Sequence, residues 1–128
     1  MWRRWDLHLH APGTKLSNAY GAPDDDTWDR FIDTLEESPV IAFGITDYFS
    51  GDTYFETVRR YVEKYPNSQK KFFLNIEFRL SESISKDGGH PHMHVIFDND
   101  PDLCGYEKIT RFLTNLETQS IDDASAKT

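Results

Sequence analysis

The spacing of apolar residues predicts four β-strands, at residues 2–10, 40–45, 71–80 and 92–98. In the first strand, Trp5, Leu7 and Leu9 alternate with polar residues, so His8 and His10 are expected on one face. The second strand is a continuous apolar run (VIAFGI), which is typical of a strand covered on both faces. The third strand alternates again between apolar and polar residues. These four segments are the predicted sheet.

Three helices are predicted between and after the strands. The first is predicted to be capped by Asp25 or Asp26 and to end at Ser38, and the others span residues 50–65 and 101–117. Each has apolar residues three and four positions apart, which gives it one face to bury. Residues 11–26 and 81–91 are predicted loops because they are rich in polar residues, glycine and proline. Residues 1–118 therefore form one domain, and residues 119–128 are expected to be a polar, frayed tail.

The order of these elements favours an α/β fold with a mainly parallel sheet, because strands alternate with helices. The third and fourth strands are the exception. Residues 81–91 join them without a helical pattern, whereas a parallel crossover needs about a dozen or more residues, usually helical. These two strands are therefore predicted to form an antiparallel hairpin. If residue 80 lies opposite residue 91, Glu77 lies opposite His94.

Composition and charge narrow the classes of protein. The 128 residues carry a net charge of −8, which argues against a broad nucleic-acid-binding face. Apolar residues make up 38% of the chain, enough for a hydrophobic core, and this excludes wholesale disorder. The longest apolar runs have about five residues, too few for a membrane-spanning helix. With a single cysteine, Cys104, and no signal-peptide pattern, the chain is expected in the cytoplasm.

All five histidines lie in two clusters, at positions 8 and 10 and at positions 90, 92 and 94. A lone histidine near a strand is commonly a surface residue or a hydrogen-bonded core residue. An H-x-H pair on a strand differs, because it holds two imidazoles on one face about 6.5–7 Å apart. Two such pairs together with strand carboxylates indicate a site for a borderline metal ion.

Topology predicts that these residues converge. Parallel α/β folds place their sites at the carboxyl ends of the strands, where His8, His10 and Asp47 lie. The start of an antiparallel fourth strand lies at the same edge, and Glu77 opposite His94 is within bridging distance of one metal ion. His92 shares a face with His94 but is expected farther from Glu77.

Four segments, taken in order, resemble the motifs of the PHP (polymerase and histidinol phosphatase) family. The segment Trp5–His10 (WDLHLH) resembles the first motif, Asp-x-His-x-His, and residues 44–48 (GITDY) resemble the second, usually Thr-Asp-His. Residues 75–77 (NIE) resemble the third, a strand segment of the form Gly/Asn-x-Glu. Residues 94–97 (HVIF) resemble the fourth, a His that opens an apolar strand. The resemblance covers residues 5–98, about three quarters of the chain.

The resemblance implies a distorted seven-stranded β/α barrel, of which four strands are visible here, with two or three divalent ions of zinc, manganese or iron. It implies phosphoester hydrolysis, with nucleic-acid or nucleotide phosphodiesters as substrates and one or two metal ions held by this chain. The implied metal ligands and catalytic carboxylates are His8, His10, Glu77, His92, His94 and Asp47. The arrangement also resembles PHP modules fused to P-loop ATPase domains, so an ATPase domain or partner is expected.

Two departures from the family pattern bear on activity. Tyr48 stands where the family usually has a metal-binding His, and a phenol hydrogen-bonds phosphate more readily than it binds zinc. The later family motifs, a His and a terminal Asp-x-His, have no match after residue 100. These departures leave two hypotheses: a metal-dependent phosphoesterase, or a catalytically degraded structural or regulatory module attached to an ATPase. A truncated chain or half-barrel is expected to have weak activity or none.

The sequence offers weaker candidates for phosphate binding, calcium binding and self-association. Arg79 can orient a phosphate, although a strand arginine is more commonly part of an ion pair. The acidic run at residues 24–26 can bind calcium, although acids before a helix are usually a solvated cap. An exposed sheet edge after the fourth strand favours a homo-oligomer unless the last helix covers it.

Overall fold

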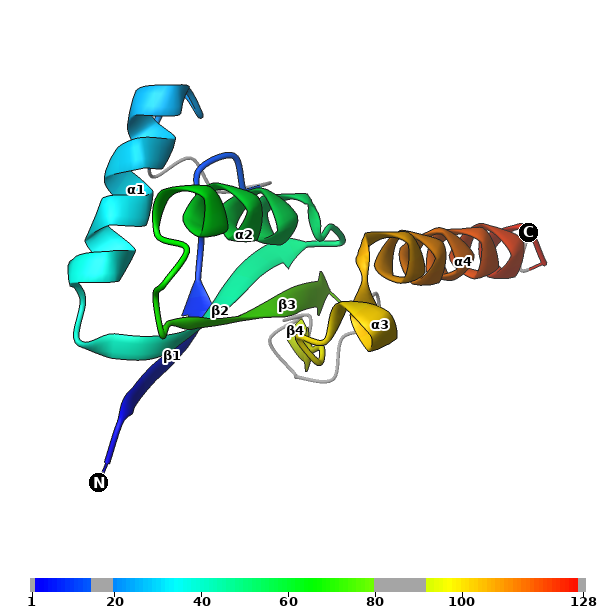
Figure 1. The fold of residues 1–128 in the computed structure, drawn as a ribbon. Coiled ribbons are helices and arrows are strands. Elements are labelled where there is room, and N and C mark those ends of the chain that lie inside the picture. Colours follow the sequence, from blue (N-terminus) through cyan, green and yellow to red (C-terminus); the bar gives the residue numbers. More distant parts are fainter. Residues whose placement is uncertain (1, 15–19, 80–91, 127–128) are drawn as a thin grey trace, which may run out of the picture.

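The structure is a computed structural model, which describes residues 2–14, 20–79 and 92–126. The elements follow the order β1 (Arg4–Leu9), α1 (Asp25–Glu37), β2 (Val40–Tyr48), α2 (Asp52–Lys64), β3 (Lys71–Arg79), β4 (His92–Ile96), α3 (Pro101–Cys104) and α4 (Tyr106–Ala126). Figure 1 shows a mixed α/β arrangement of one sheet with helices beside it, in which α1 and α2 come between strands of the sheet. Among these residues, no helix combines the length and the apolar character needed to cross a membrane.

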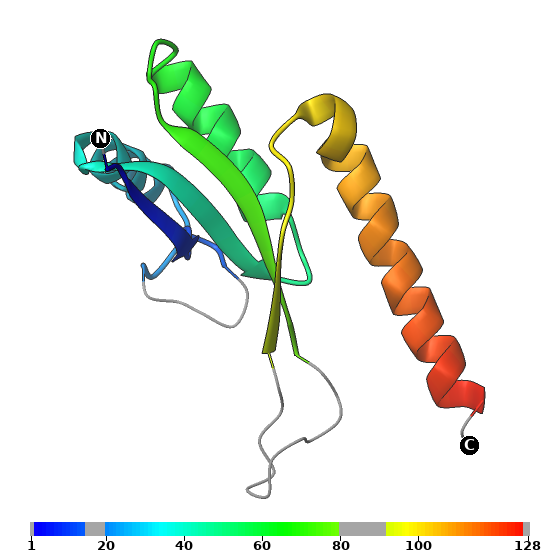
Figure 2. The same cartoon turned by 90° about the horizontal axis from the view of Figure 1, so that it is seen from below.

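The sheet is a curled half-barrel of four strands in the order β1-β2-β3-β4. Strands β1, β2 and β3 are parallel, and β3 pairs with β4 in antiparallel fashion. The predicted α/β class with a mainly parallel sheet and the predicted antiparallel hairpin are therefore confirmed. In Figure 2 the carboxyl ends of β1, β2 and β3 and the start of β4 point to the same side of the sheet.

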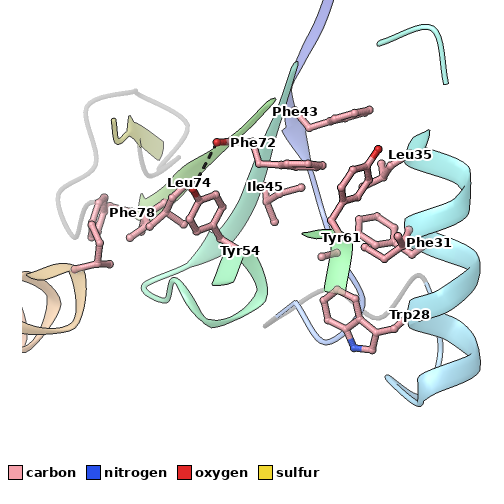
Figure 3. Close-up of a cluster of buried hydrophobic side chains, with 14 residues drawn as sticks. Trp28, Phe31, Leu35, Phe43, Ile45, Tyr54, Tyr61, Phe72, Leu74 and Phe78 are labelled. Carbon is pink, nitrogen blue, oxygen red and sulfur yellow. Dashed lines mark hydrogen bonds between the residues drawn. The ribbon is translucent and has the colours of Figure 1, made fainter. Parts of the chain in front are cut away.

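Helices α1 and α2 cover one face of the sheet and form the core with it (Figures 1 and 3). The apolar stripe of α1, with Trp28, Phe31 and Leu35, is buried as its spacing predicts. The same buried cluster includes Ile45 of β2 and Ile76 of β3, which are fully buried. Figure 2 shows that the opposite face of the sheet has no helix over it in the described part of the chain.

The end of β2 and the cap of α1 differ from the sequence prediction. Strand β2 continues to Tyr48, three residues past the predicted end, because Thr46, Asp47 and Tyr48 stay paired with β3. The cap of α1 is Asp24 and neither of the predicted residues: its carboxylate accepts a hydrogen bond from the Thr27 amide at 2.8 Å. That bond lowers the pKa of Asp24.

The predicted helix 101–117 is two helices that meet at Gly105. A Cβ at this position would lie 2.7 Å from the carbonyl oxygen of Pro101, so the break needs a residue without a side chain. The second helix, α4, continues to Ala126, so the segment predicted to be a frayed tail is helical up to that residue. Helix α4 contacts the core through Ile109, which is buried, and through Leu113 and Leu116.

Candidate metal centre

The candidate site lies at the carboxyl edge of the parallel strands, on the face that α1 and α2 do not cover. The strand register places Tyr48 of β2 beside Glu77 of β3, and Glu77 directly opposite His94 of β4. The predicted pairing of Glu77 with His94 is thus confirmed. Because paired residues point to the same face of a sheet, all three side chains project from the open face.

Three side chains meet there as potential metal ligands. His8, Glu77 and His94 each offer one ligand atom, and these atoms all lie within 4.8 Å of one another. The imidazole rings of His8 and His94 have their centroids 4.8 Å apart. Glu77 is buried, with only 4% of its surface exposed, whereas both histidines are exposed. The cluster therefore has a fixed carboxylate at its base and two imidazoles toward solvent.

An irregularity in β1 brings His8 to the cluster. Strand β1 pairs only with β2 and is separated by β2 from β3, which carries Glu77. The register of β1 shifts between Asp6 and Leu9, and the backbone of Leu7 passes directly over Gly44. A Cβ at position 44 would lie 2.2 Å from the Leu7 carbonyl oxygen. Gly44 therefore permits the close approach that carries β1 toward β3.

Asn75 fixes this approach and one imidazole at the same time. Its Nδ2 donates a 2.8 Å hydrogen bond to the Leu7 carbonyl oxygen, across the top of β2. Its Oδ1 lies 3.2 Å from Nδ1 of His94. Because an amide oxygen only accepts, His94 donates its Nδ1 proton, which leaves the lone pair of Nε2 available to a metal ion. This is the usual outer-shell arrangement for a metal-binding histidine.

His92 holds the carboxylate of Glu77. Its Nδ1 lies 2.6 Å from Oε1 of Glu77, close enough for a charge-assisted hydrogen bond. In the register, His92 lies opposite Arg79, two positions farther along the hairpin than His94. The expected greater distance from Glu77 therefore holds for the backbone, but the ring of His92 still reaches the carboxylate. With Oε1 held in this way, Oε2 remains for an ion.

His10 does not join the three-residue cluster in the part of the chain that the structure describes. Its Nδ1 is 3.1 Å from the carbonyl oxygen of Thr46, to which it donates. Its ring stacks on Tyr48, with a centroid separation of 6.0 Å and an interplanar angle of 15°, and meets His8 edge-on at 5.2 Å. His10 and Tyr48 thus form an aromatic wall beside the cluster.

Asp47 lies on the other face of β2. It is buried, its Oδ1 accepts a hydrogen bond from the Tyr48 amide at 2.7 Å, and its Oδ2 accepts one from the Thr53 hydroxyl at 3.2 Å. The carboxylate therefore ties β2 to the first turn of α2. The side chain of Arg79, and His90 as a whole, lie outside the residues that the structure describes.

The donor set fits a divalent metal ion. Two histidines and one carboxylate, with a further position left for water, make up the ligand set of many catalytic zinc sites, and the same set holds iron(II) in other proteins. Ligand atoms around tetrahedral zinc are separated by about 3.3 Å, given metal–ligand distances of about 2.0–2.1 Å. The present limit of 4.8 Å is larger. These atoms would therefore have to move closer together to hold a tetrahedral ion.

Two residues that support the cluster, Gly44 and Asn75, were not identified as functional from the sequence. Asn75 carried a recognisable signal, because it is a polar residue on a buried strand two positions before Glu77 and therefore on the same face. Gly44 carried a weaker one, as a glycine within an apolar strand. Comparison of the chain with protein-family models, curated proteins and solved structures finds no match.

Proposed function

We propose that this protein is a metal-dependent phosphoesterase whose metal ion is held by His8, Glu77 and His94. The observation that carries the proposal is the three-residue cluster at the carboxyl edge of the parallel strands, with its donor atoms within 4.8 Å of one another. A bound divalent ion supplies Lewis acidity toward a phosphoryl oxygen and lowers the pKa of a coordinated water. Zinc, manganese and iron are the candidate ions.

The side chains around the cluster have distinct tasks in this proposal. His92 holds one carboxylate oxygen of Glu77, and Asn75 holds the ring of His94, so two ligands are oriented before an ion arrives. Tyr48 stands beside Glu77 in the register and can donate its hydroxyl to a phosphate oxygen. The exposed side of His8 and His94 leaves room for a phosphoester to approach from solvent.

The PHP resemblance adds the substrate class to the proposal. The four motif-like segments contribute His8, Tyr48, Glu77 and His94, and these residues lie along one edge of one face of the sheet. This arrangement supports a PHP-type barrel and, with it, hydrolysis of nucleic-acid or nucleotide phosphodiesters. A P-loop ATPase domain or partner is part of the same proposal.

Metal binding is the first test. An ion that binds only the folded chain raises its stability by RT ln(1 + [L]/Kd), about 2.7 kcal/mol at a hundredfold excess over Kd. Thermal unfolding with zinc or manganese, and again with a chelator, measures this shift. Glu77→Gln is expected to abolish it, while the matched control Glu63→Gln, on the exposed side of α2, is expected to retain it. An unchanged melting temperature for the original chain would refute the site.

Turnover is the second test. Bis-p-nitrophenyl phosphate and single-stranded DNA, each with manganese, are suitable substrates for the chain and for Glu77→Gln and Glu63→Gln. Hydrolysis that requires metal and Glu77 supports the enzyme. Stoichiometric metal binding without hydrolysis by this chain would refute the proposal that it is an enzyme by itself.

One observation favours a second candidate, a metal-binding module without activity of its own. The described cluster has three ligands, enough for one ion, and His10 is engaged with the Thr46 carbonyl group. Two-metal hydrolysis needs two ions about 3.5–4 Å apart, each with several ligands. Weak turnover by the 128-residue chain is therefore expected, and robust turnover that is lost in Glu77→Gln would exclude the module.

A further inference from the structure

The half-barrel sheet has two edges without a partner in the described part of the chain. Strand β1 pairs only with β2, and β4 pairs only with β3. Each edge presents a row of backbone N–H and C=O groups, which proteins normally pair, cover or protect with charge. Figure 2 shows both edge strands bordering the open face, with α4 off to the side of β4.

Apolar side chains lie exposed on this open face. Trp5 on β1 is 61% exposed although its ring stacks on Phe73 at a centroid distance of 6.3 Å. Ile96 on β4 is 46% exposed and pairs with Asn75, so it projects from the same face. An eight-stranded barrel has an interior just wide enough for side chains to fill. These residues are placed where the interior of a closed barrel would be.

Helix α4 leaves this face open. The ring of Phe112 packs edge-on against Phe97 at 5.8 Å. Phe97 belongs to the side chains that pack against the helix-covered core, as does Val95 two residues earlier. Helix α4 therefore lies on the outer side of β4, away from Trp5 and Ile96.

The two edges carry opposite charges at the same end of the sheet. Arg3 and Arg4 stand at the start of β1, exposed and without an ion pair to any described carboxylate. Strand β4 runs the other way, so its end lies at that same end of the sheet, and the exposed carboxylates of Asp98, Asp100 and Asp102 follow it. A strand β4 placed antiparallel to a strand β1 would bring the acids next to the arginines.

We propose that a second copy of this chain completes the barrel. Strand β4 of each copy pairs in antiparallel fashion with β1 of the other, which gives a closed eight-stranded barrel with a two-fold axis along its centre. This pairing provides hydrogen-bond partners for the free backbone groups of β1 and β4. It also buries Trp5 and Ile96 in the interior and places Arg3 and Arg4 next to the partner's acidic residues. Both metal-ligand clusters then open on the same mouth. A continuous sheet formed by two β4 strands would leave β1 and its arginines unpaired.

The test is the oligomeric state and needs neither metal nor activity, so its outcome is independent of the proposed function. Light scattering after gel filtration is expected to give twice the mass of the 14.9 kDa chain. Two charge-reversal variants follow, Arg3→Glu/Arg4→Glu and Asp98→Lys/Asp102→Lys. In a dimer of either variant by itself, like charges would face each other at both places where β4 of one copy meets β1 of the other. This repulsion is expected to weaken association about a hundredfold or more. Asp100 is left unchanged because it caps α3.

Mixing the two variants gives the decisive result. In the heterodimer, glutamates face lysines at one junction and arginines face aspartates at the other, so dimers are expected to return only in the mixture. This recovery also shows that both variants fold. The control Asp29→Lys/Arg30→Glu, on the exposed side of α1, is expected to remain a dimer. A chain that is monomeric at every concentration, a dimer that persists in both variants, or a mixture that does not recover would each overturn the proposal.

Discussion

Replacing Asn75 with leucine tests how the sheet positions the metal ligands. Leucine has the same branched side-chain shape and number of heavy atoms as asparagine and keeps the buried position filled, but it can neither donate to the Leu7 carbonyl oxygen nor accept from His94. The substitution therefore removes the link that holds β1 across β2 and frees the imidazole of His94.

The expected loss of stability follows from the two hydrogen bonds that Asn75 makes. Each contributes about 1 kcal/mol net to the free energy of unfolding, so their loss lowers it by about 2 kcal/mol. For a chain of this length, such a change lowers the melting temperature by roughly 5–10 °C. Metal affinity is expected to fall separately, by about 10- to 100-fold, because loss of an outer-shell partner leaves a metal-binding histidine unoriented.

Chemical denaturation of the metal-free protein and calorimetric titration with zinc measure the two effects. Asn115→Leu, an exposed change of the same kind on α4, is the matched control and is expected to alter neither quantity. A loss of stability with unchanged zinc affinity would refute the argument that Asn75 orients a ligand. Unchanged stability would refute the argument that it holds β1 in place.

Three further predictions concern the rest of the fold. Gly44→Ala is expected to lower the free energy of unfolding by about 1–3 kcal/mol and to weaken zinc binding, because its Cβ would collide with the Leu7 carbonyl oxygen; equal zinc affinity by calorimetry would contradict this. Ile76→Ala, at a fully buried position, is expected to cost about 2–5 kcal/mol by urea denaturation, and a cost below that of Ile76→Val would count against the core described here. The hydrogen bond from Tyr65 to Asp33 raises the pKa of Tyr65 to about 12. The pKa of Tyr65 in the folded protein exceeds its ordinary value of 10.0, so the bond stabilises the fold below pH 10, and this stabilisation is lost as the pH rises through 12. An ultraviolet titration in which Asp33→Asn fails to lower the pKa of Tyr65 would refute this prediction.

Several features of this protein follow from local patterns that the sequence displays. The period-two alternation of β1 and β3 and the apolar stripe of α1 predict elements that the structure contains. The short connection after β3 predicts an antiparallel hairpin, and simple counting from its loop predicts that Glu77 faces His94. These inferences succeed because strand pairing changes side-chain partners in fixed steps, so a register set at the loop holds along the hairpin.

Tertiary structure decided the remaining features, since each depends on contacts between segments far apart in the chain. The sequence places His8 and His10 on one face, but only the crossing of β1 over Gly44 determines that His8 reaches Glu77 while His10 turns to the Thr46 carbonyl group. Asp47 follows an apolar run as a catalytic carboxylate would, yet the continuation of β2 points it at α2. A bulge shifts the alternation of side chains along a strand by one residue, and the end of a strand depends on pairing with the neighbouring strand. Neither feature can be recognised from the local pattern of polar and apolar residues.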